Sequence, residues 1–196
     1  MAIILASGSP RRRELMELLG LPFIVRAPDT DEPAPEARLS PEENLERIAR
    51  AKLAASGGAG DGGDDIVLAA DTVVVLDGAY YGKPEDLPDA ARILRRLSGR
   101  THAVYTGVAA RHRGFSEFIC ERTLVTFREL TEGEISEYAE SRRPLDKAGA
   151  YGIQDSGFAE RIDGDWYNAM GLPLGRVRSL LHNAGAARTG AAEVTG

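Results

Sequence analysis

The chain alternates between short runs of apolar, β-branched residues and stretches in which apolar residues recur every three or four positions. The short runs predict strands over residues 2–6, 23–26, 66–70, 73–76, 102–110 and 118–127. The helical spacing predicts helices over residues 10–19, 41–53, 90–97, 132–140 and 172–181. Helices and strands are mixed without strict alternation, so the pattern predicts an α/β fold with a mixed sheet and flanking helices.

Capping and turn residues mark where several of these elements begin and end. Capping boxes of the form Ser/Thr-x-x-Glu open two of the helices, at residues 40–43 and 131–134. Turn signals predict hairpins at residues 77–78, 113–114 and 163–165. We expect the last hairpin to join a strand over residues 158–162 to a short strand at residues 166–167.

Length and composition indicate an ordinary globular protein. The 196 residues suit one well-buried domain, which we expect over residues 1–183, with residues 184–196 as a flexible tail. A Gly/Asp-rich connection near residues 56–65 does not separate two differently composed halves. The chain shows no basic-then-apolar leader and no stretch of membrane-spanning length, so we expect a cytoplasmic protein without a membrane partner.

Charge and cysteine content exclude several classes of function. The net charge of −6 argues against general attraction to nucleic acid, so any anion site must be a local group of Lys and Arg. The single cysteine, Cys120, excludes an intramolecular disulfide and a cysteine-rich zinc site. Its apolar neighbours predict a buried structural thiol rather than a nucleophile.

The first candidate for chemistry is the turn after the first predicted strand. Ser7, Gly8 and Ser9 are small residues that let a ligand approach the backbone, and they lead into a helix with Pro10 at its first position. Residues 11–13 are all arginines, which oppose the helix dipole, so local stability does not explain them. The turn therefore predicts a phosphate site, with three solvated surface arginines as the alternative.

Asp71 is the second candidate, because it lies between two apolar, β-branched runs. A carboxylate in that setting needs a partner, and it could orient or deprotonate a water molecule or bind Mg²⁺. The alternative is a strand-end aspartate that caps a turn. An acidic loop that includes Glu32 could share a cation with Asp71, although solvated loop charge also explains it.

Two lysines and one loop complete the candidate set. Lys83 lies on a loop constrained by glycine and proline, whereas Lys52 could belong to the exposed face of a helix. The segment over residues 146–154 contains two glycines, Tyr151 and Gln154, and can wrap a flat heterocycle. An ordinary Gly-rich connection is the alternative for this segment.

Taken together, these segments closely resemble the Maf family of nucleoside triphosphate pyrophosphatases over about residues 3–182. The resemblance rests on residues 5–12, 70–74, 82–84, 97–99, 146–154 and 171–173, in family order. It implies a Maf/inosine-triphosphatase-like fold with two lobes around a cleft. It also implies hydrolysis of a nucleoside triphosphate to the monophosphate and pyrophosphate, with Mg²⁺ or Mn²⁺ as the divalent metal cation.

The resemblance further implies roles for individual residues. Asp71 matches the family's proton acceptor, and Glu32 matches a second acidic candidate for the metal site. The positions that mark the subfamily acting on dTTP and UTP, including modified pyrimidine nucleotides as candidates, are Arg11, Thr72 and Gln154. The positions that match phosphate-site residues of the family are Ser7, Arg12, Lys52 and Lys83. The Gly/Asp-rich insertion and residues 168–170 depart from the family pattern and put loop geometry in doubt, not chemistry.

Two other functions stay open at the level of sequence. A nucleotidyltransferase also begins with an apolar strand, a small-residue turn and arginine, and it would need an acceptor substrate. A non-enzymatic regulator of septum formation would keep its role without Asp71. The expected partner is a nucleoside triphosphate, and a homodimer is compatible with the chain.

Overall fold

The structure is a computed structural model that describes residues 1–28, 33–56 and 64–185. Its centre is a seven-stranded mixed sheet in the order β2-β1-β3-β5-β6-β7, with β4 paired to β3. The strands are β1 (Ile3–Ala6), β2 (Phe23–Val25), β3 (Ile66–Leu76), β4 (Ala79–Tyr81), β5 (Thr101–His112), β6 (Phe115–Phe127) and β7 (Ala159–Asp163). Strand β1 runs parallel to β2 and β3, and the other pairs are antiparallel. The predicted α/β fold with a mixed sheet is confirmed.

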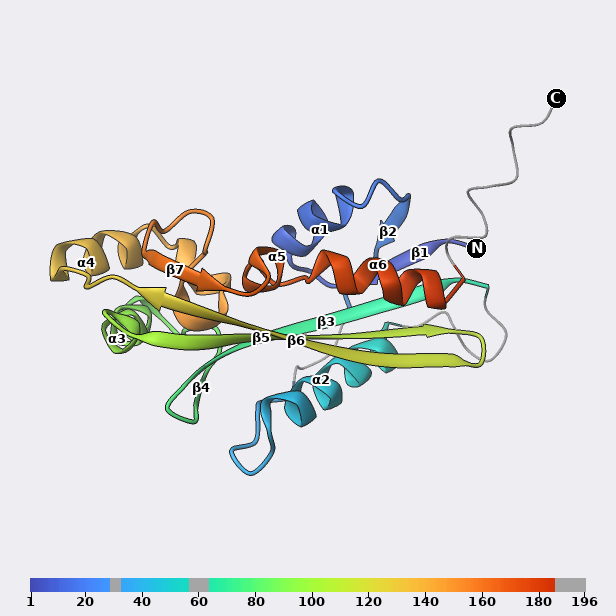
Figure 1. The fold of residues 1–196 in the computed structure, drawn as a ribbon, viewed down its shortest axis with the longest axis horizontal. Helices are drawn as coiled ribbons and strands as arrows, with labels where there is room; N and C mark the ends of the chain where they lie inside the picture. The colour runs from blue at the N-terminus through green and yellow to red at the C-terminus, as the bar shows by residue number, and fades with distance from the viewer. Residues whose placement is uncertain (29–32, 57–63, 186–196) are drawn as a thin grey trace.

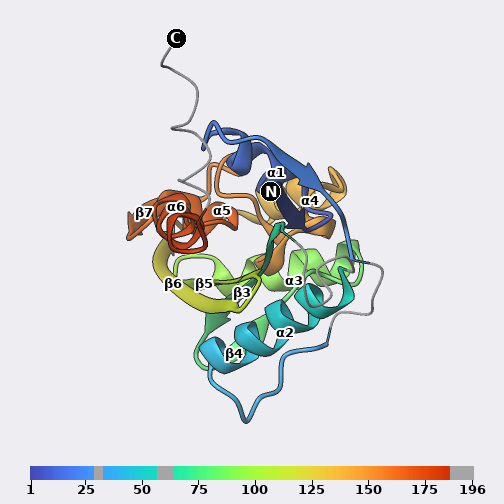
Figure 2. The same ribbon diagram turned by 90° about the vertical axis from the view of Figure 1, so that its right-hand side faces the viewer.

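Helices cover both faces of the long strands. They are α1 (Pro10–Glu17), α2 (Pro41–Ala55), α3 (Leu87–Leu97), α4 (Glu132–Glu140), α5 (Trp166–Met170) and α6 (Leu174–Asn183). Two short 3₁₀ helices, Arg143–Asp146 and Ala148–Ala150, follow α4. Figure 1 shows α2 below β3, β5 and β6, with α1 and α6 on the opposite side, and Figure 2 shows the same layers end-on. None of the helices among the described residues is long and apolar enough to cross a membrane.

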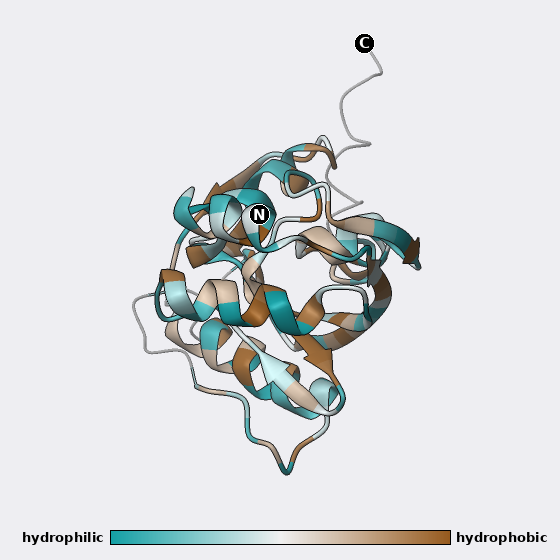
Figure 3. Ribbon diagram, turned by 90° about the vertical axis from the view of Figure 1, so that its left-hand side faces the viewer, coloured by the Kyte–Doolittle hydropathy of each residue, from teal (hydrophilic) through white to brown (hydrophobic). Residues whose placement is uncertain are grey.

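Alternation along β1 shows how the sheet divides the core. Ile3 and Leu5 point into the cluster beneath α1 and α6, whereas Ile4 and Ala6 point into the cluster beneath α2. Successive side chains of a strand face opposite sides of the sheet, so a strand covered on both faces is apolar at every position. A third cluster joins β5 and β6 to α3, α4 and residues 148–153. In Figure 3 the helices carry both hydrophilic and hydrophobic residues, consistent with one exposed face and one buried face.

The predicted helix starts and two of the hairpins agree with the structure. Ser40 and Glu43 exchange side chain-to-backbone hydrogen bonds at the start of α2, and Thr131 and Glu134 do the same at α4. The hairpin between β5 and β6 closes with His112 opposite Phe115. Strand β4 returns from β3 across the predicted turn at residues 77–78.

Three sequence expectations are corrected. Residues 66–76 form one continuous strand and not two, so Asp71 lies at mid-strand, paired with Gly107 of β5. Residues 166–167 begin helix α5, because the Asp165 side chain accepts hydrogen bonds from the backbone N–H groups of Tyr167 and Asn168 and so caps a helix. Cys120 is only partly buried; even so, burial raises the pKa of its thiol to about 12, which keeps it from acting as a nucleophile.

Candidate active site

One pocket of about 490 Å³ collects the sequence-predicted residues. It is lined by the turn after β1, the middle of β3, the segment after β4 and the loop over residues 146–154. The predicted site residues that line it are Ser7, Arg11, Arg12, Lys52, Asp71, Thr72, Lys83 and Gln154. Glu32 lies outside the described residues, as do Asp29 and Asp31 of the same acidic loop.

The three arginines that follow the turn after β1 lie in different surroundings. Ser7 is buried, and its hydroxyl accepts hydrogen bonds from the Ser9 N–H and from Arg12 Nη1, each at 3.3 Å. Arg11 and Arg12 line the pocket, whereas exposed Arg13 pairs with Glu17 one turn further along α1 and is not among the lining residues. The predicted anion-binding run therefore contributes two of its three guanidinium groups to the pocket.

Arg12 is fixed by groups from three parts of the chain. Its Nε donates to the Gly171 carbonyl at 3.0 Å, and its Nη2 donates to the Thr72 hydroxyl at 3.0 Å. Gly171 has φ +117°, a left-handed conformation that ends α5 and turns its carbonyl toward Arg12. The planar guanidinium is held before any ligand arrives, which is the preorganisation that anion recognition requires.

A chain of hydroxyl groups continues from Arg12 into the sheet. Thr72 Oγ1 lies 3.0 Å from Thr106 Oγ1, and the Thr106 hydroxyl donates to the Asn168 carbonyl at 3.1 Å. The hydrogen between the two threonines must therefore come from Thr72. Since Thr72 already accepts from Arg12 and donates to Thr106, its hydroxyl can only accept a hydrogen bond from a ligand in the pocket.

Lys52 and Asp71 form a largely buried ion pair. Lys52 Nζ lies 2.6 Å from Asp71 Oδ1 and 3.4 Å from the Ala70 carbonyl, and the two side chains are 4% and 15% exposed. The alternative that Lys52 belongs to an exposed helix face is wrong, because α2 turns this residue toward β3. The ammonium neutralises the Asp71 carboxylate and fixes its orientation.

A second ion pair joins two walls of the pocket. Arg11 Nη1 donates to Asp146 Oδ2 at 2.7 Å, and Nη2 donates to the Asp146 carbonyl at 3.1 Å. Lys147 Nζ donates to Asp146 Oδ1 at 2.9 Å. Partial burial raises the pKa of Asp146, but its bonds to Lys147 and Arg11 outweigh burial and leave the pKa below its usual range. The turn after β1 and the loop over residues 146–154 are therefore tied together.

The loop over residues 146–154 is shaped by Gly149 and Tyr151. Gly149 has φ +71°, and a Cβ there would lie 2.7 Å from Val74 Cγ2, so the loop can pass this close to β3 only with glycine. Tyr151 is buried, and its ring packs edge-on against His102 and Phe127. Gln154 is exposed and lines the pocket, so its amide can form hydrogen bonds to a ligand.

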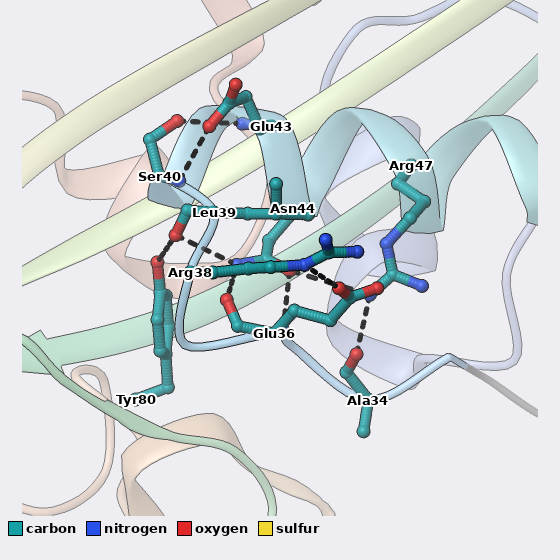
Figure 4. A network of polar contacts seen from close by, with 9 residues as sticks. All are labelled: Ala34, Glu36, Arg38, Leu39, Ser40, Glu43, Asn44, Arg47 and Tyr80. Carbon is teal, nitrogen blue, oxygen red and sulfur yellow. Dashed lines mark hydrogen bonds and ion pairs between the residues drawn. The ribbon is translucent and has the colours of Figure 1, made fainter.

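The loop before α2 forms a further wall and is held by the helix itself (Figure 4). The buried Asn44 side chain accepts from the Glu36 N–H at 2.7 Å and donates to the Glu36 carbonyl at 2.9 Å. Arg47 Nη2 donates to the Ala34 carbonyl at 2.6 Å. These contacts fix Ala34 and Pro35, which also line the pocket.

Sequence reasoning missed two residues of this site. Thr106 could have been identified from the sequence, because it is a polar residue that alternates with Val104 and Val108 on one buried face of a strand. Asp146 begins the segment that the sequence singled out, but its pairing with Arg11, 135 positions away in the chain, carries no local signal. Within the described parts of the chain, no group of three or more His, Cys, Asp or Glu side chains could hold a metal ion by itself.

Comparison with known proteins agrees with this architecture. The family model described as "Maf-like protein" matches residues 2–184. The dTTP/UTP pyrophosphatase of Thermotoga maritima is 48% identical over 187 residues, which cover 94% of this chain and 90% of that protein. The dTTP/UTP pyrophosphatase of Bacillus velezensis is 45% identical over 181 residues, 91% of this chain and 94% of that protein.

A solved structure shares the fold at much lower sequence identity. The Ham1 protein of Staphylococcus aureus aligns with a TM-score of 0.52 at 13% identity, over 93% of this chain and 99% of its own. That likeness concerns the arrangement of strands and helices alone. The family match over nearly the whole chain, together with relatives close to half identical, shows that this chain belongs to the Maf-like protein family.

Proposed function

We propose that this protein hydrolyses dTTP and UTP to the nucleoside monophosphate and pyrophosphate. The observation that carries the proposal is the meeting of Arg11 and Arg12, Asp71 and Gln154 in one pocket. These groups address the phosphates, the water and the base of a nucleotide. The names of the Thermotoga and Bacillus relatives, both dTTP/UTP pyrophosphatases, support the same substrates.

The phosphates of the substrate lie against the turn after β1. Ser7, Arg11, Arg12 and Lys83 supply hydrogen bonds and positive charge from two sides of the pocket. They offset the charge of the triphosphate and the charge that develops on the leaving pyrophosphate. Arg12 is held before substrate binds, because its bonds to Gly171 and Thr72 fix the plane of its guanidinium.

Asp71 accepts a proton from the water that attacks the α-phosphorus. Lys52 holds one carboxylate oxygen, so the other oxygen has a fixed direction relative to β3. General-base catalysis of this kind contributes about 10²–10⁴-fold to the rate. Lys52 thus acts here through Asp71; a direct bond from its ammonium to a phosphate, as the family resemblance implies, stays a prediction.

A divalent cation fits the oxygen donors of this pocket. Mg²⁺ is usually held by one or two carboxylates together with substrate phosphates, so Asp71 and the triphosphate supply a suitable set. Glu32 is the second protein candidate, on the loop outside the described residues. When bound, Mg²⁺ or Mn²⁺ would polarise the phosphate oxygens and stabilise their charge.

The base is selected by hydrogen-bond direction. Uracil and thymine present two carbonyl acceptors on either side of one N–H donor, whereas cytosine lacks that hydrogen. The Thr72 hydroxyl can only accept, which suits the N–H, and the Gln154 amide can donate to a carbonyl. A mismatch leaves buried polar groups unpaired and costs about 1–3 kcal/mol.

A nucleotide panel tests this function. The purified protein is incubated with UTP, dTTP, CTP, GTP and 7-methyl-GTP, with and without Mg²⁺ or Mn²⁺, and pyrophosphate is measured separately from phosphate. We expect pyrophosphate from UTP and dTTP in the presence of metal. Release of phosphate alone, or turnover only when a sugar-phosphate acceptor is added, would reject the proposal, the latter in favour of a nucleotidyltransferase.

The remaining expectations belong to the same proposal. Nucleoside triphosphates are cytoplasmic metabolites, so the substrate favours a cytoplasmic location. Residues 1–183 form the catalytic domain, whereas most of the expected tail lies outside the described residues. The two-lobe description and a homodimer stay predictions, which a crystal structure with nucleotide and a sedimentation measurement would test.

A further inference from the structure

The hydroxyl of Tyr138 lies beneath the turn that carries Gln154. Tyr138 belongs to α4, is 7% exposed and does not line the pocket. Its hydroxyl oxygen accepts a hydrogen bond from the Gly152 N–H at 3.0 Å, and it donates to Asp155 Oδ1 at 2.6 Å. One buried hydroxyl thus holds the turn on both sides of Gln154.

The turn has few other anchors for Gln154. The Gly152 carbonyl accepts from the N–H groups of Asp155 at 3.3 Å and Ser156 at 3.0 Å, which closes the chain around Gln154. Ile153 is buried in the core cluster next to α3 and α4. Gln154 itself is exposed, so its direction is set by the backbone of this turn and not by packing of its own side chain.

The turn of residues 152–156 is closely packed around the Asp155 side chain. A Cβ on Gly152 would lie 2.6 Å from Asp155 Oδ1, so the carboxylate folds closely over the turn to reach Tyr138. Burial, together with the bond to Asp155, raises the pKa of Tyr138, so the hydroxyl keeps its proton and the donated bond persists at neutral pH.

We propose that Tyr138 is a positioning residue for base selection, which acts by holding the turn of residues 152–156 so that Gln154 meets the pyrimidine. The inference rests on the proposed function. An amide distinguishes donors from acceptors only when its two ends are held in a fixed orientation, and loosening the turn lets them adapt to other bases. Phosphate binding also draws on Ser7, Arg12 and Lys83, which lie outside the turn of residues 152–156, so it should depend much less on Tyr138.

The first test is Tyr138→Phe. The phenyl ring keeps the edge-on contact with Phe158 and the stacking of Arg143, and only the two hydrogen bonds are lost. We expect the KM for UTP and dTTP to rise ~5- to 10-fold, as loss of about one net hydrogen bond implies. The preference for UTP over CTP should fall by a similar factor, with kcat and inhibition by inorganic pyrophosphate within about twofold of wild type.

Three further variants separate positioning from general damage. Asp155→Ala removes the acceptor at an exposed position, so it tests the proposal even if Tyr138→Phe does not fold, and it should raise the KM in the same way. Asp155→Asn keeps an oxygen that can accept from Tyr138, so it should restore the UTP preference. Tyr105→Phe removes a hydroxyl from a tyrosine that does not line the pocket and should behave as wild type.

The outcomes distinguish this inference from the proposed function. If the wild-type protein hydrolyses UTP and dTTP but Tyr138→Phe keeps the KM and the UTP preference, the positioning role is wrong and the function stands. If Tyr138→Phe weakens inhibition by pyrophosphate as much as it raises the KM for UTP, the effect is general and the inference also fails. A wild-type protein without activity on UTP and dTTP overturns both.

Discussion

The ammonium of Lys52 lies 2.6 Å from the carboxylate of Asp71, and both side chains are largely removed from solvent at the centre of β3. This pair joins a helix to a strand and places the proposed proton acceptor next to an ammonium group. It also makes Asp71 matter for stability as well as for catalysis, and the two effects can be separated.

Asp71→Asn should abolish pyrophosphate release and leave the fold intact. An amide of the same size can still accept a hydrogen bond from Lys52, but it cannot take a proton from water. We expect kcat to fall by at least ~100-fold, the lower end for a general base. Circular dichroism provides the control, and near wild-type turnover in a folded variant would remove Asp71 from the mechanism.

Lys52→Met should destabilise the protein, because it leaves the Asp71 carboxylate without its charged partner. Breaking a buried pair from one side costs about 3 kcal/mol or more in free energy of unfolding. Urea unfolding measures this loss. Lys52→Met combined with Asp71→Asn should recover much of it, and equal losses in the single and double variants would show that the pair is not the cause.

Lys83→Met should weaken every nucleotide alike, because a phosphate contact does not depend on the base. We expect the KM for UTP, dTTP and CTP to rise at least about tenfold each, close to the lower end for a hydrogen bond to a charged group. Arg13→Ala is the control for the loss of one positive charge. Arg13 pairs with Glu17 and does not line the pocket, so its loss should leave the KM values unchanged. A Lys83 variant that loses UTP and keeps CTP would move this lysine to the base site.

Gln154→Glu should erode the preference for uracil and thymine. The change replaces the amide donor with a second acceptor, so a carbonyl of the base loses its partner. The ratio of kcat/KM for UTP to that for CTP should fall ~10-fold, about 1.4 kcal/mol. The same ratio of kcat/KM should be measured for a variant of Arg11. The family resemblance places Arg11 among the specificity positions, although its guanidinium contacts Asp146. An unchanged ratio in the glutamate variant would exclude Gln154 from base selection.

Stability should fall in mild acid through His102. Burial lowers the pKa of this imidazole to about 4, below the 6.5 of an exposed histidine. Between these values the unfolded chain binds a proton that the folded chain does not, so stability is complete above pH 6.5 and declines toward pH 4. We expect a contribution of about 2 kcal/mol to the loss between pH 8 and pH 5. His102→Leu should flatten this part of the profile in urea unfolding, and an identical slope in both proteins would contradict the assignment.

The comparison of sequence with structure shows which signals are local. Periodicity and caps located the helices at Ser40 and Thr131 and the long antiparallel strands, because those signals lie within a few residues of the elements they define. The same local reading placed a strand at Trp166, where the Asp165 side chain instead caps a helix. It also divided β3 at Asp71, because a charge within an apolar run resembles the end of a strand.

Those site residues were predictable that stand in an unusual local sequence. The arginine run, the isolated Asp71 and the Gly-rich loop drew attention to residues that do line one pocket. Their pairings were not predictable, because Arg11 with Asp146 and Lys52 with Asp71 depend on how distant segments come together. Tyr138 resembles an ordinary core residue in sequence, since its hydroxyl acquires its partners only in the folded chain.

The position of Asp71 at the middle of an 11-residue strand has a consequence for redesign. Backbone pairing with β5 on one side of β3, and the crowded Gly107 opposite Asp71, make this part of the enzyme intolerant of insertion or exchange. Within the turn of residues 152–156, Gly152 is crowded and Ile153 is buried, whereas Gln154 is exposed. An attempt to retarget the enzyme to another base should therefore leave the strands and the anchors of this turn untouched and vary Gln154 itself, as antibodies vary loops on a constant framework.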